Sequence, residues 1–403
     1  MEPKIRFKGF EGEWIETSLS NLSSNFKYGI NAAAVSFDGE NKYLRITDID
    51  DTMHSFLQND VTSPGTDLSC CDEYLMQDGD IVIARTGASV GKSYIYHPFD
   101  GKVYFAGFLI RMRLNENTNR DFVFQNTLTN AYAKHVQFVS QRSGQPGINV
   151  NELQAYKLRI PSLSEQQFIA TYFRTLDNKI QSTSKKLASL KKLKSASLVA
   201  MFPQNGESKP KVRFKGFEGE WIIKSFKELY KRSSIKNDLT YDSSKIISVA
   251  NMYFKEDNMN TDEAYLLTYN VMKLGDIAFE GNKSKSFAHG RFVENSIGNG
   301  IVSHVFVVFS PLNEDYDINF WKYYINNEQV MGSKLVRCTK SSTMMTDLVV
   351  DDFLKETILV PSLEEQQEVG RYFATLDRKI ALETARLEKL KQIKLACLDK
   401  MFV

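Results

Sequence analysis

The chain contains one stretch whose residue types could bind phosphate, Thr86-Gly-Ala-Ser-Val-Gly-Lys-Ser93. A nucleotide-binding loop wraps backbone amides around the phosphates, and it needs four residues between its first glycine and the Gly-Lys-Ser triplet. Only three residues separate Gly87 from Gly91, and the second half of the chain has Gly281-Asn-Lys-Ser-Lys instead. We therefore do not expect a nucleotide-binding loop. Two interpretations stay open: a glycine-rich basic turn that contacts another phosphate, and a purely structural turn.

A second basic stretch occurs in each half of the chain, shortly before a long predicted helix. The two stretches are Gln141-Arg-Ser-Gly-Gln-Pro-Gly147 and Arg337-Cys-Thr-Lys-Ser-Ser-Thr343. Arg, Lys, Gln and Ser are side chains that bind phosphates and hydrogen-bond to base edges. For any single residue, a solvated loop is the simpler interpretation. Two loops at equivalent places with different sequences are nevertheless what two readers of different base sequences require.

Residues for catalysis or metal binding do not form any recognisable pattern. The five histidines (His54, His97, His135, His289 and His304) are scattered, and the four cysteines (Cys70, Cys71, Cys338 and Cys397) lack metal-ligand spacing. Such cysteines are typical of a reduced cytosolic protein. The chain has no Pro-Pro pair, which the adenine methyltransferase motif needs, and no Pro-Asp pair, which begins the usual nuclease motif. We therefore expect a chain without catalytic residues, metal or cofactor of its own.

The elements that must position these loops are revealed by an internal duplication. Residues 160–180 and 360–380 are identical at 13 of 21 positions, including Pro-Ser-Leu-(Ser/Glu)-Glu-Gln-Gln. Ser162 and Glu165, like Ser362 and Glu365, have the spacing of a capping box at a helix start. Apolar residues then recur at three- and four-residue steps, interrupted once in each copy by Thr183 or Glu383: Ile169, Phe173, Leu176, Ile180, Leu187 and Leu190, with counterparts 200 residues later. This period predicts two long helices that pair as an antiparallel coiled coil rather than as a face of a compact bundle.

A second duplicated segment precedes each half. Residues 5–14 (Ile-Arg-Phe-Lys-Gly-Phe-Glu-Gly-Glu-Trp) return at 212–221 with nine of ten identical, and we call these two segments the lead-ins. Between lead-in and helix lie the first insert (residues 15–160) and the second insert (residues 222–360), whose sequences have diverged. Short runs of β-branched and aromatic residues predict mixed α/β structure in both inserts. One scaffold is therefore expected to carry two different inserts.

The expected fold class is α+β with a pseudo-twofold internal repeat. The domain boundaries that follow are 1–160 for the first domain, 161–202 for the central helix, 203–211 for a linker, 212–360 for the second domain and 361–403 for the C-terminal helix. Within the first insert, strands are expected at 46–49, 79–84, 93–96 and 108–114, and a helix at 121–138. Within the second, strands are expected at 245–250, 275–279 and 301–309, and a helix at 319–327.

Composition narrows the classes of protein further. Hydrophobic residues make up 42 % and charged residues 25 % of the 403 residues, which are ordinary values for globular domains. The net charge of +2 does not by itself indicate a polyanionic partner, so any basic surface must be local. No apolar run approaches the ~20 residues of a membrane span, and the N-terminus is unlike a signal peptide. A cytoplasmic protein without membrane contact is expected.

The two lead-ins, the two Pro-Ser-Leu helix starts and Ala84-Arg-Thr-Gly-Ala-Ser-Val-Gly-Lys92 together resemble the specificity subunit of type I restriction–modification enzymes. The resemblance covers essentially the whole chain, although the second insert departs from it at Phe279-Glu-Gly-Asn-Lys-Ser-Lys. It implies that each insert is a target-recognition domain for one half of a bipartite double-stranded DNA sequence. It also implies that the paired helices set the distance between half-sites and bind two modification subunits, which use S-adenosylmethionine. Two restriction subunits, which use ATP and Mg, would complete the enzyme.

Candidate DNA contacts follow from the basic loops under this interpretation. They are Arg85, Thr86, Lys92, Arg142, Ser143 and Gln145 for the first half-site, and Asn282, Lys283, Lys285, Lys340, Ser341 and Thr343 for the second. Two alternatives remain: a coiled-coil scaffold whose inserts bind proteins, and a nucleotide hydrolase built on Gly91 and Lys92. Replacing one insert by that of a relative distinguishes DNA recognition from protein binding, because only DNA recognition predicts a change in one half of the methylated motif. Assaying the purified chain for nucleotide hydrolysis tests the hydrolase alternative.

Overall fold

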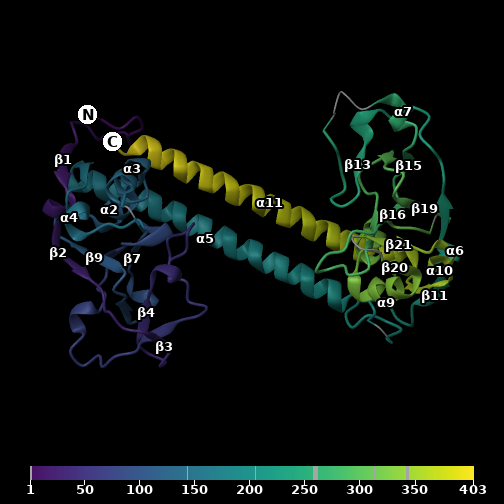
Figure 1. Cartoon of the computed structure of the whole chain (residues 1–403), viewed down its shortest axis with the longest axis horizontal. Helices are drawn as coiled ribbons and strands as arrows, with labels where there is room; N and C mark the ends of the chain where they lie inside the picture. Colours follow the sequence, from purple (N-terminus) through teal and green to yellow (C-terminus); the bar gives the residue numbers. More distant parts are fainter. Residues whose placement is uncertain (1, 143, 205, 257–261, 313–314, 342–344) are drawn as a thin grey trace. The chain divides into compact units, whose positions relative to one another are not determined.

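The computed structural model describes residues 2–142, 144–204, 206–256, 262–312, 315–341 and 345–403. The chain forms two compact units, Met1–Lys185 with Thr384–Val403, and Lys186–Glu383. Each unit contains one insert together with parts of both long helices, α5 (Leu163–Ala200) and α11 (Leu363–Met401) (Figure 1). The α+β class with two repeated domains and two long helices is therefore confirmed.

The first insert contains short strands, helices and 3-10 turns. In chain order they are β1 (Ile15–Ser18), α1 (Leu19–Leu22), β2 (Ser23–Tyr28), β3 (Ala34–Ser36), β4 (Lys42–Leu44), η1 (Ile46–Asp48), β5 (Thr62–Pro64), η2 (Asp72–Tyr74), β6 (Ile81–Ala84), η3 (Gly87–Ser89), β7 (Ser93–Ile95), η4 (Pro98–Asp100), β8 (Val103–Phe105), β9 (Leu109–Leu114), α2 (Arg120–Asn126), α3 (Asn130–Val139), α4 (Val150–Gln154) and β10 (Lys157–Ile160).

The second insert has a related element order. Its elements are β11 (Ile222–Ser225), α6 (Phe226–Leu229), β12 (Tyr230–Ser233), η5 (Ser243–Lys245), β13 (Ile247–Ser248), β14 (Tyr253–Phe254), α7 (Glu263–Leu266), β15 (Asn270–Met272), β16 (Ile277–Glu280), β17 (Arg291–Glu294), β18 (Gly300–Val302), β19 (Val307–Pro311), α8 (Ile318–Tyr324), α9 (Glu328–Cys338), β20 (Thr339–Ser341), β21 (Thr346–Leu348), α10 (Val350–Lys355) and β22 (Thr357–Val360).

Equivalent antiparallel sheets form the centre of each insert. The strand order is β2-β9-β6-β7 in the first insert and β12-β19-β16-β17 in the second. The strands β6 and β16 are buried along their whole length, which explains the apolar sequence of β6 and of β16 up to Phe279, and the buried Glu280 at the end of β16 pairs with Arg291. A smaller pairing, β1 with β10 and β11 with β22, connects the lead-in side of each insert to the strand that enters the long helix. The sheets thereby hold both ends of each insert at its helix.

The long helices begin where the duplicated serines predict. Ser162 Oγ accepts a hydrogen bond from the Glu165 amide at 3.4 Å, and Ser362 Oγ accepts one from the Glu365 amide at 3.3 Å. Only this half of the predicted capping box is present, because the Glu165 carboxylate binds Arg6 instead of reaching back to the serine. The glutamates therefore serve tertiary structure rather than helix capping.

Within each unit, the two long helices run antiparallel. In the first unit, Lys394 Nζ lies 2.7 Å from Asp177 Oδ1, and Tyr172 Oη lies 3.4 Å from Cys397 Sγ. Later residues of α5 thus contact earlier residues of α11, as in an antiparallel pair. The second unit repeats both contacts with Lys194 and Asp377 at 2.5 Å, and with Ser197 and Tyr372 at 2.8 Å.

The apolar stripe of each helix is not confined to a coiled-coil seam, which corrects the prediction from its 3.5-residue period. Ile169 and Phe173 are buried in the core of the first insert with Phe122, and Phe173 lies 5.8 Å from Phe402 between ring centroids. In the second unit, Phe373 packs in the same way on Phe202, 5.6 Å away. The start of each helix is therefore an integral part of an insert core.

Several local predictions were wrong for identifiable reasons. Residues 46–48 form a 3-10 turn rather than a strand, because the Asp48 carboxylate accepts hydrogen bonds from the Arg45 amide and guanidinium, and only Ile49 makes a β-bridge, to Phe56. The helix expected at 121–138 is divided into α2 and α3, since Thr129 caps a new helix by accepting from the Tyr132 amide at 3.3 Å. Residues 301–309 form two strands separated at 303–306, and only 247–248 of the strand expected at 245–250 is present.

Across the described ranges, none of the helices combines the length and hydrophobicity that crossing a membrane would require.

Candidate nucleic-acid interface

The two basic loops of the first insert lie against each other. The Gly87 amide donates to the carbonyl oxygen of Pro146 at 2.9 Å, and the Ile148 amide donates to that of Arg85 at 2.8 Å. Gly87 has a φ of +76°, and a Cβ on it would lie 2.8 Å from Nε2 of Gln145. The absence of a side chain at Gly87 therefore lets the second loop approach the first.

The candidate side chains of the first insert differ in how they are engaged. Lys92 Nζ donates to the Ile49 carbonyl at 2.9 Å and pairs with Asp51 at 2.7 Å, and only 11 % of its side chain is exposed. Arg142 pairs with Glu152 and donates to the carbonyl of Val139, where it covers the end of α3. Lys92 and Arg142 therefore already have partners within the fold.

Arg85, Thr86 and Gln145 are engaged less. Arg85 and Thr86 are half-buried, and Gln145 is exposed. The Arg85 guanidinium lies over the ring of Tyr28, with Cζ 4.6 Å from the ring centroid. Ser143 lies outside the described residues. The structure thus brings the two predicted loops together but leaves only part of the predicted set facing outward.

The second insert repeats this juxtaposition with different side chains. The Thr346 amide donates to the Gly281 carbonyl at 2.8 Å, and Asn282 forms a β-bridge with Met345. A Cβ on Gly281 would lie 2.2 Å from the Thr346 carbonyl oxygen, so the backbones meet directly. The predicted residues Asn282, Lys283, Lys285 and Lys340 are all exposed. Thr343 and the side chain of Ser341 lie outside what the structure describes.

The place of Arg337 differs from the prediction. Arg337 and Cys338 are the last residues of α9, not part of a loop, and the Arg337 guanidinium pairs with Glu356 at 2.6 Å. The strands β20 and β21 follow as a hairpin. The predicted stretch 337–343 therefore runs from the end of α9 into β20, and residues 342 and 343 lie outside the described residues.

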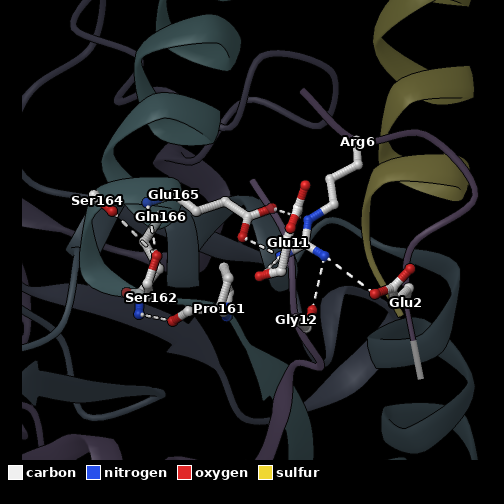
Figure 2. A network of polar contacts seen from close by, with 9 residues as sticks. All are labelled: Glu2, Arg6, Glu11, Gly12, Pro161, Ser162, Ser164, Glu165 and Gln166. Atoms are coloured by element: carbon white, nitrogen blue, oxygen red, sulfur yellow. Dashed lines mark hydrogen bonds and ion pairs between the residues drawn. The ribbon is translucent and has the colours of Figure 1, made fainter. Parts of the chain in front are cut away.

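The lead-ins and the helix starts hold the insert in place through a buried ion pair that sequence reasoning missed. Arg6 Nε and Nη2 donate to the two carboxylate oxygens of Glu165, both at 2.8 Å, and Arg6 Nη1 donates to the Gly12 carbonyl at 2.7 Å (Figure 2). Arg213 binds Glu365 at 2.8 and 2.6 Å in the second unit. These hydrogen bonds raise the pKa of both arginines. The signal was an arginine and a glutamate that are identical in both copies.

The glutamine after each glutamate has an equally specific structural role. Gln166 Nε2 donates to the Pro161 carbonyl at 2.9 Å, and its Oε1 accepts from the Asn119 amide at 3.1 Å. Asn119 is the residue that caps α2. Gln366 makes the corresponding bonds to Pro361 and to Asp317, which caps α8. The duplicated helix-start sequence is thus explained by the attachment of each insert to its helix.

An aspartate about three turns further along each long helix joins the insert to both helices. Asp177 accepts from Gln125 of α2 at 3.0 Å and pairs with Lys394 of α11. Asp377 accepts from Tyr323 of α8 at 2.5 Å and pairs with Lys194 of α5. These junctions fix the loops of each insert relative to the helix pair within the same unit.

The local electrostatics and geometry do not suit a nucleotide. Burial lowers the pKa of His54, so this imidazole adds no charge near Lys92 at neutral pH. The Gly87–Lys92 segment forms a 3-10 turn that leads into strand β7, whereas a phosphate-binding loop opens a helix. Nowhere in the described ranges do three or more His, Cys, Asp or Glu side chains gather as metal ligands would.

The chain presents two equivalent pairs of polar loops whose side chains differ. This arrangement defines a class of protein with two recognition sites of different specificity. The type I restriction modification DNA specificity domain matches this chain twice, over residues 23–192 and 219–392. The chain therefore belongs to this family, and it is a DNA sequence-recognition subunit of a type I restriction–modification system.

Solved structures share the fold over the full length. The S subunit of a type I restriction–modification system from M. genitalium has 14 % identity and a TM-score of 0.62, and the match covers 100 % of this chain and 99 % of that one. A chain from a study of complex assembly and conformational transition of the type I R-M system has 13 % identity and a TM-score of 0.51, with 96 % and 97 % covered. At these identities the likeness concerns the fold.

Proposed function

We propose that each insert reads one half of a bipartite double-stranded DNA target through its two adjacent loops. The observation that carries this proposal is the repeated juxtaposition: Gly87 with Pro146 in the first insert, and Gly281 with Thr346 in the second. The lead-in arginine and the glutamate and glutamine of the helix start make equivalent contacts in both units, whereas the loop side chains differ. Sequence is read by side chains at base edges, so a constant scaffold with variable loops suits two half-sites.

The candidate contacts differ in exposure and in the pairs that the structure shows. We assign to DNA the less engaged residues of the first insert, Arg85, Thr86 and Gln145, and the exposed residues of the second, Asn282, Lys283, Lys285 and Lys340. Lys92 and Arg142 could reach DNA only by giving up their pairs with Asp51 and Glu152. Ser143, Ser341 and Thr343 stay candidates from the sequence alone.

The chain would act as the non-catalytic part of a larger enzyme in the cytoplasm. We assign adenine methylation to two modification subunits with S-adenosylmethionine, and ATP-dependent cleavage with Mg to two restriction subunits. The paired helices would bind the modification subunits and set the spacing between half-sites, since a rigid spacer converts half-site distance into a geometric property. This chain would contribute sequence recognition and no cofactor.

Exchange of one insert tests the proposal. Residues 15–160 would be replaced by the corresponding insert of another specificity subunit, and methylated adenines would be mapped across the host genome. We expect one half of the methylated motif to change while the other half and the spacing stay constant.

The reciprocal exchange of residues 222–360 is the matched control, and it should change the other half only. A motif that stays the same after either exchange, or changes in both halves after one exchange, would contradict the assignment of one half-site to each insert.

A further inference from the structure

Arg85 is held in a position from which its guanidinium can act on a ligand. It follows β6 directly, its amide donates to the Phe108 carbonyl at 3.0 Å, and its carbonyl accepts from the Ile148 amide at 2.8 Å. Its backbone is therefore fixed on both sides by neighbouring segments. In the part of the chain that the structure describes, no carboxylate pairs with this guanidinium, unlike Arg45, which pairs with Asp48 at 2.8 Å.

Tyr28 orients the guanidinium. The Tyr28 ring lies under it at 4.6 Å, and the tyrosine hydroxyl accepts from the Val150 amide at 3.2 Å. Strand pairing of Tyr28 with Ile110 holds the other end of the tyrosine. Arg85 Nε is buried without a hydrogen-bond partner among the described residues. An incoming ligand would therefore be bound end-on by the two Nη groups, while the ring supports the flat face of the cation.

The surroundings of Arg85 suit the edge of a base. It lines a hollow of about 680 Å³ together with Tyr28, Asn31, Thr47, Gly107 and Phe108. Phe108 is 63 % exposed and lines the same hollow, so its ring is accessible to a ligand bound there. A planar guanidinium with two free donor groups matches O6 and N7 of guanine in the major groove, whereas a phosphate needs neither the ring support nor the apolar neighbour.

The second insert cannot repeat this arrangement. The shared Gly-Asp-Ile sequences at 79–81 and 275–277 place Gly281 where the first insert has Arg85. A Cβ at Gly281 would lie 2.2 Å from the Thr346 carbonyl oxygen, so a side chain is excluded there. The feature is thus specific to the first insert, as a determinant of one half-site should be.

We propose that Arg85 reads a guanine in the first half-site through its Nη groups, that Tyr28 is the positioning residue, and that Phe108 packs against the adjacent base. This inference rests on the proposed function. It assigns one base identity to one side chain and predicts that the half-site read by residues 15–160 contains a guanine.

The test uses the enzyme assembled from the full chain and its modification subunits, with methylation rates measured on duplexes that carry the mapped target. Replacing the guanine by 7-deazaguanine removes N7, and it should slow methylation by the wild-type enzyme roughly 5- to 150-fold. Inosine keeps O6 and N7 and should be methylated like guanine. R85A should lose the response to 7-deazaguanine and accept other bases at that position.

Tyr28→Leu should relax the same position although Arg85 is present, and Tyr28→Phe should restore the preference because it keeps the ring. Lys102→Ala removes an exposed cation of the same insert and should leave every base preference unchanged. A half-site without guanine, an R85A enzyme that still responds to 7-deazaguanine, or uniform weakening on all sequences would overturn the proposal. The insert exchange can still succeed in each of these cases, so the two failures are distinguishable.

Discussion

Glu294 is a carboxylic acid in the core of the second insert, on the strand that flanks β16. It is 1 % exposed, its Oε2 accepts from the Tyr316 hydroxyl at 2.9 Å, and that hydroxyl lies 3.0 Å from the hydroxyl of Tyr230. The other carboxylate oxygen has no donor among the described residues. Desolvation by burial raises the pKa of Glu294 well above its ordinary 4.5. The structure therefore favours the protonated acid.

This burial predicts a pH-dependent gain from Glu294→Gln. The folded protein keeps a proton on Glu294 that the unfolded chain releases above pH 4.5, so wild-type stability falls as pH rises through that value. The amide has no charge to lose and still accepts from Tyr316. The variant should be more stable than wild type at pH 7 to 8, and the difference should disappear at pH 4.

Urea denaturation measures this difference in free energy of unfolding. Both proteins would carry Trp14→Phe, so that fluorescence reports only Trp221 and Trp321 in the second unit. A difference in stability that is the same at every pH would show that Glu294 is ionised in the folded protein.

Residue types alone predicted only part of the candidate DNA-binding site. Local sequence patterns predict where strands end and loops begin, so the positions of the basic loops could be predicted. The structure shows that these predicted loops lie against each other. The sequence could not show that Lys92 is paired with Asp51, since these residues are 41 positions apart and meet only in the fold. In the sequence, Arg85 is one of several candidate cations. What distinguishes it from the others is the contact of its guanidinium with the Tyr28 ring, which only the structure shows.

At the scale of elements, the lead-in acts as a clamp on the start of the long helix. Arg6 is 15 % exposed at its side chain and Glu165 only 2 %, so the pair is largely removed from water. Periodicity predicted the helices and the serine predicted their start. The contact between Arg6 and Glu165 spans 159 positions, and no local pattern encodes it. The duplication indicated the importance of both residues, while their pairing required the structure.

Arg6→Ala should therefore destabilise the first unit by roughly 3 kcal/mol, since it leaves the Glu165 carboxylate buried without its cation. Hydrogen exchange should accelerate in peptides from 5–14 and 161–175, and remain unchanged in 212–221. Lys8→Ala is the control, because Lys8 is exposed in the same lead-in.

Adding Glu165→Gln to Arg6→Ala should recover part of the loss, because the double variant has no unpaired charge to bury. A double variant that is less stable than Arg6→Ala would mean that Glu165 contributes by contacts other than this ion pair.

At the scale of the whole molecule, the two units make an equivalent contact between lead-in and helix end with different chain connectivity. In the second unit, the Val212 amide donates to the Ala200 carbonyl at 2.9 Å, and a linker joins the end of α5 to the lead-in. In the first unit, the Ile5 amide donates to the Lys400 carbonyl at 2.9 Å without any peptide connection between these segments. The two chain ends lie together there (Figure 1).

A circular permutant should therefore fold and keep the methylated motif. Val403 would be joined to Met1 by a copy of residues 203–211, and the chain would be opened between Gly206 and Glu207. The closed loop (Val403, the copy of 203–211 and residues 1–4) is longer than the opened loop 203–211, but the entropy of loop closure grows only slowly with length, so we expect a stability change below ~1 kcal/mol. Denaturation and genome-wide mapping of methylated adenines would measure stability and motif.

An opening between Leu158 and Arg159 is the matched control for this permutant. It divides β10, which pairs with β1 along Ile15–Ser18, and it separates the first insert from its helix. This variant should fail to fold because pairing that closes the insert is lost on both sides of the cut. If the linker permutant also failed, peptide continuity at residues 203–211 would be part of what holds the second unit together, and the noncovalent contact between Ile5 and Lys400 could not replace it.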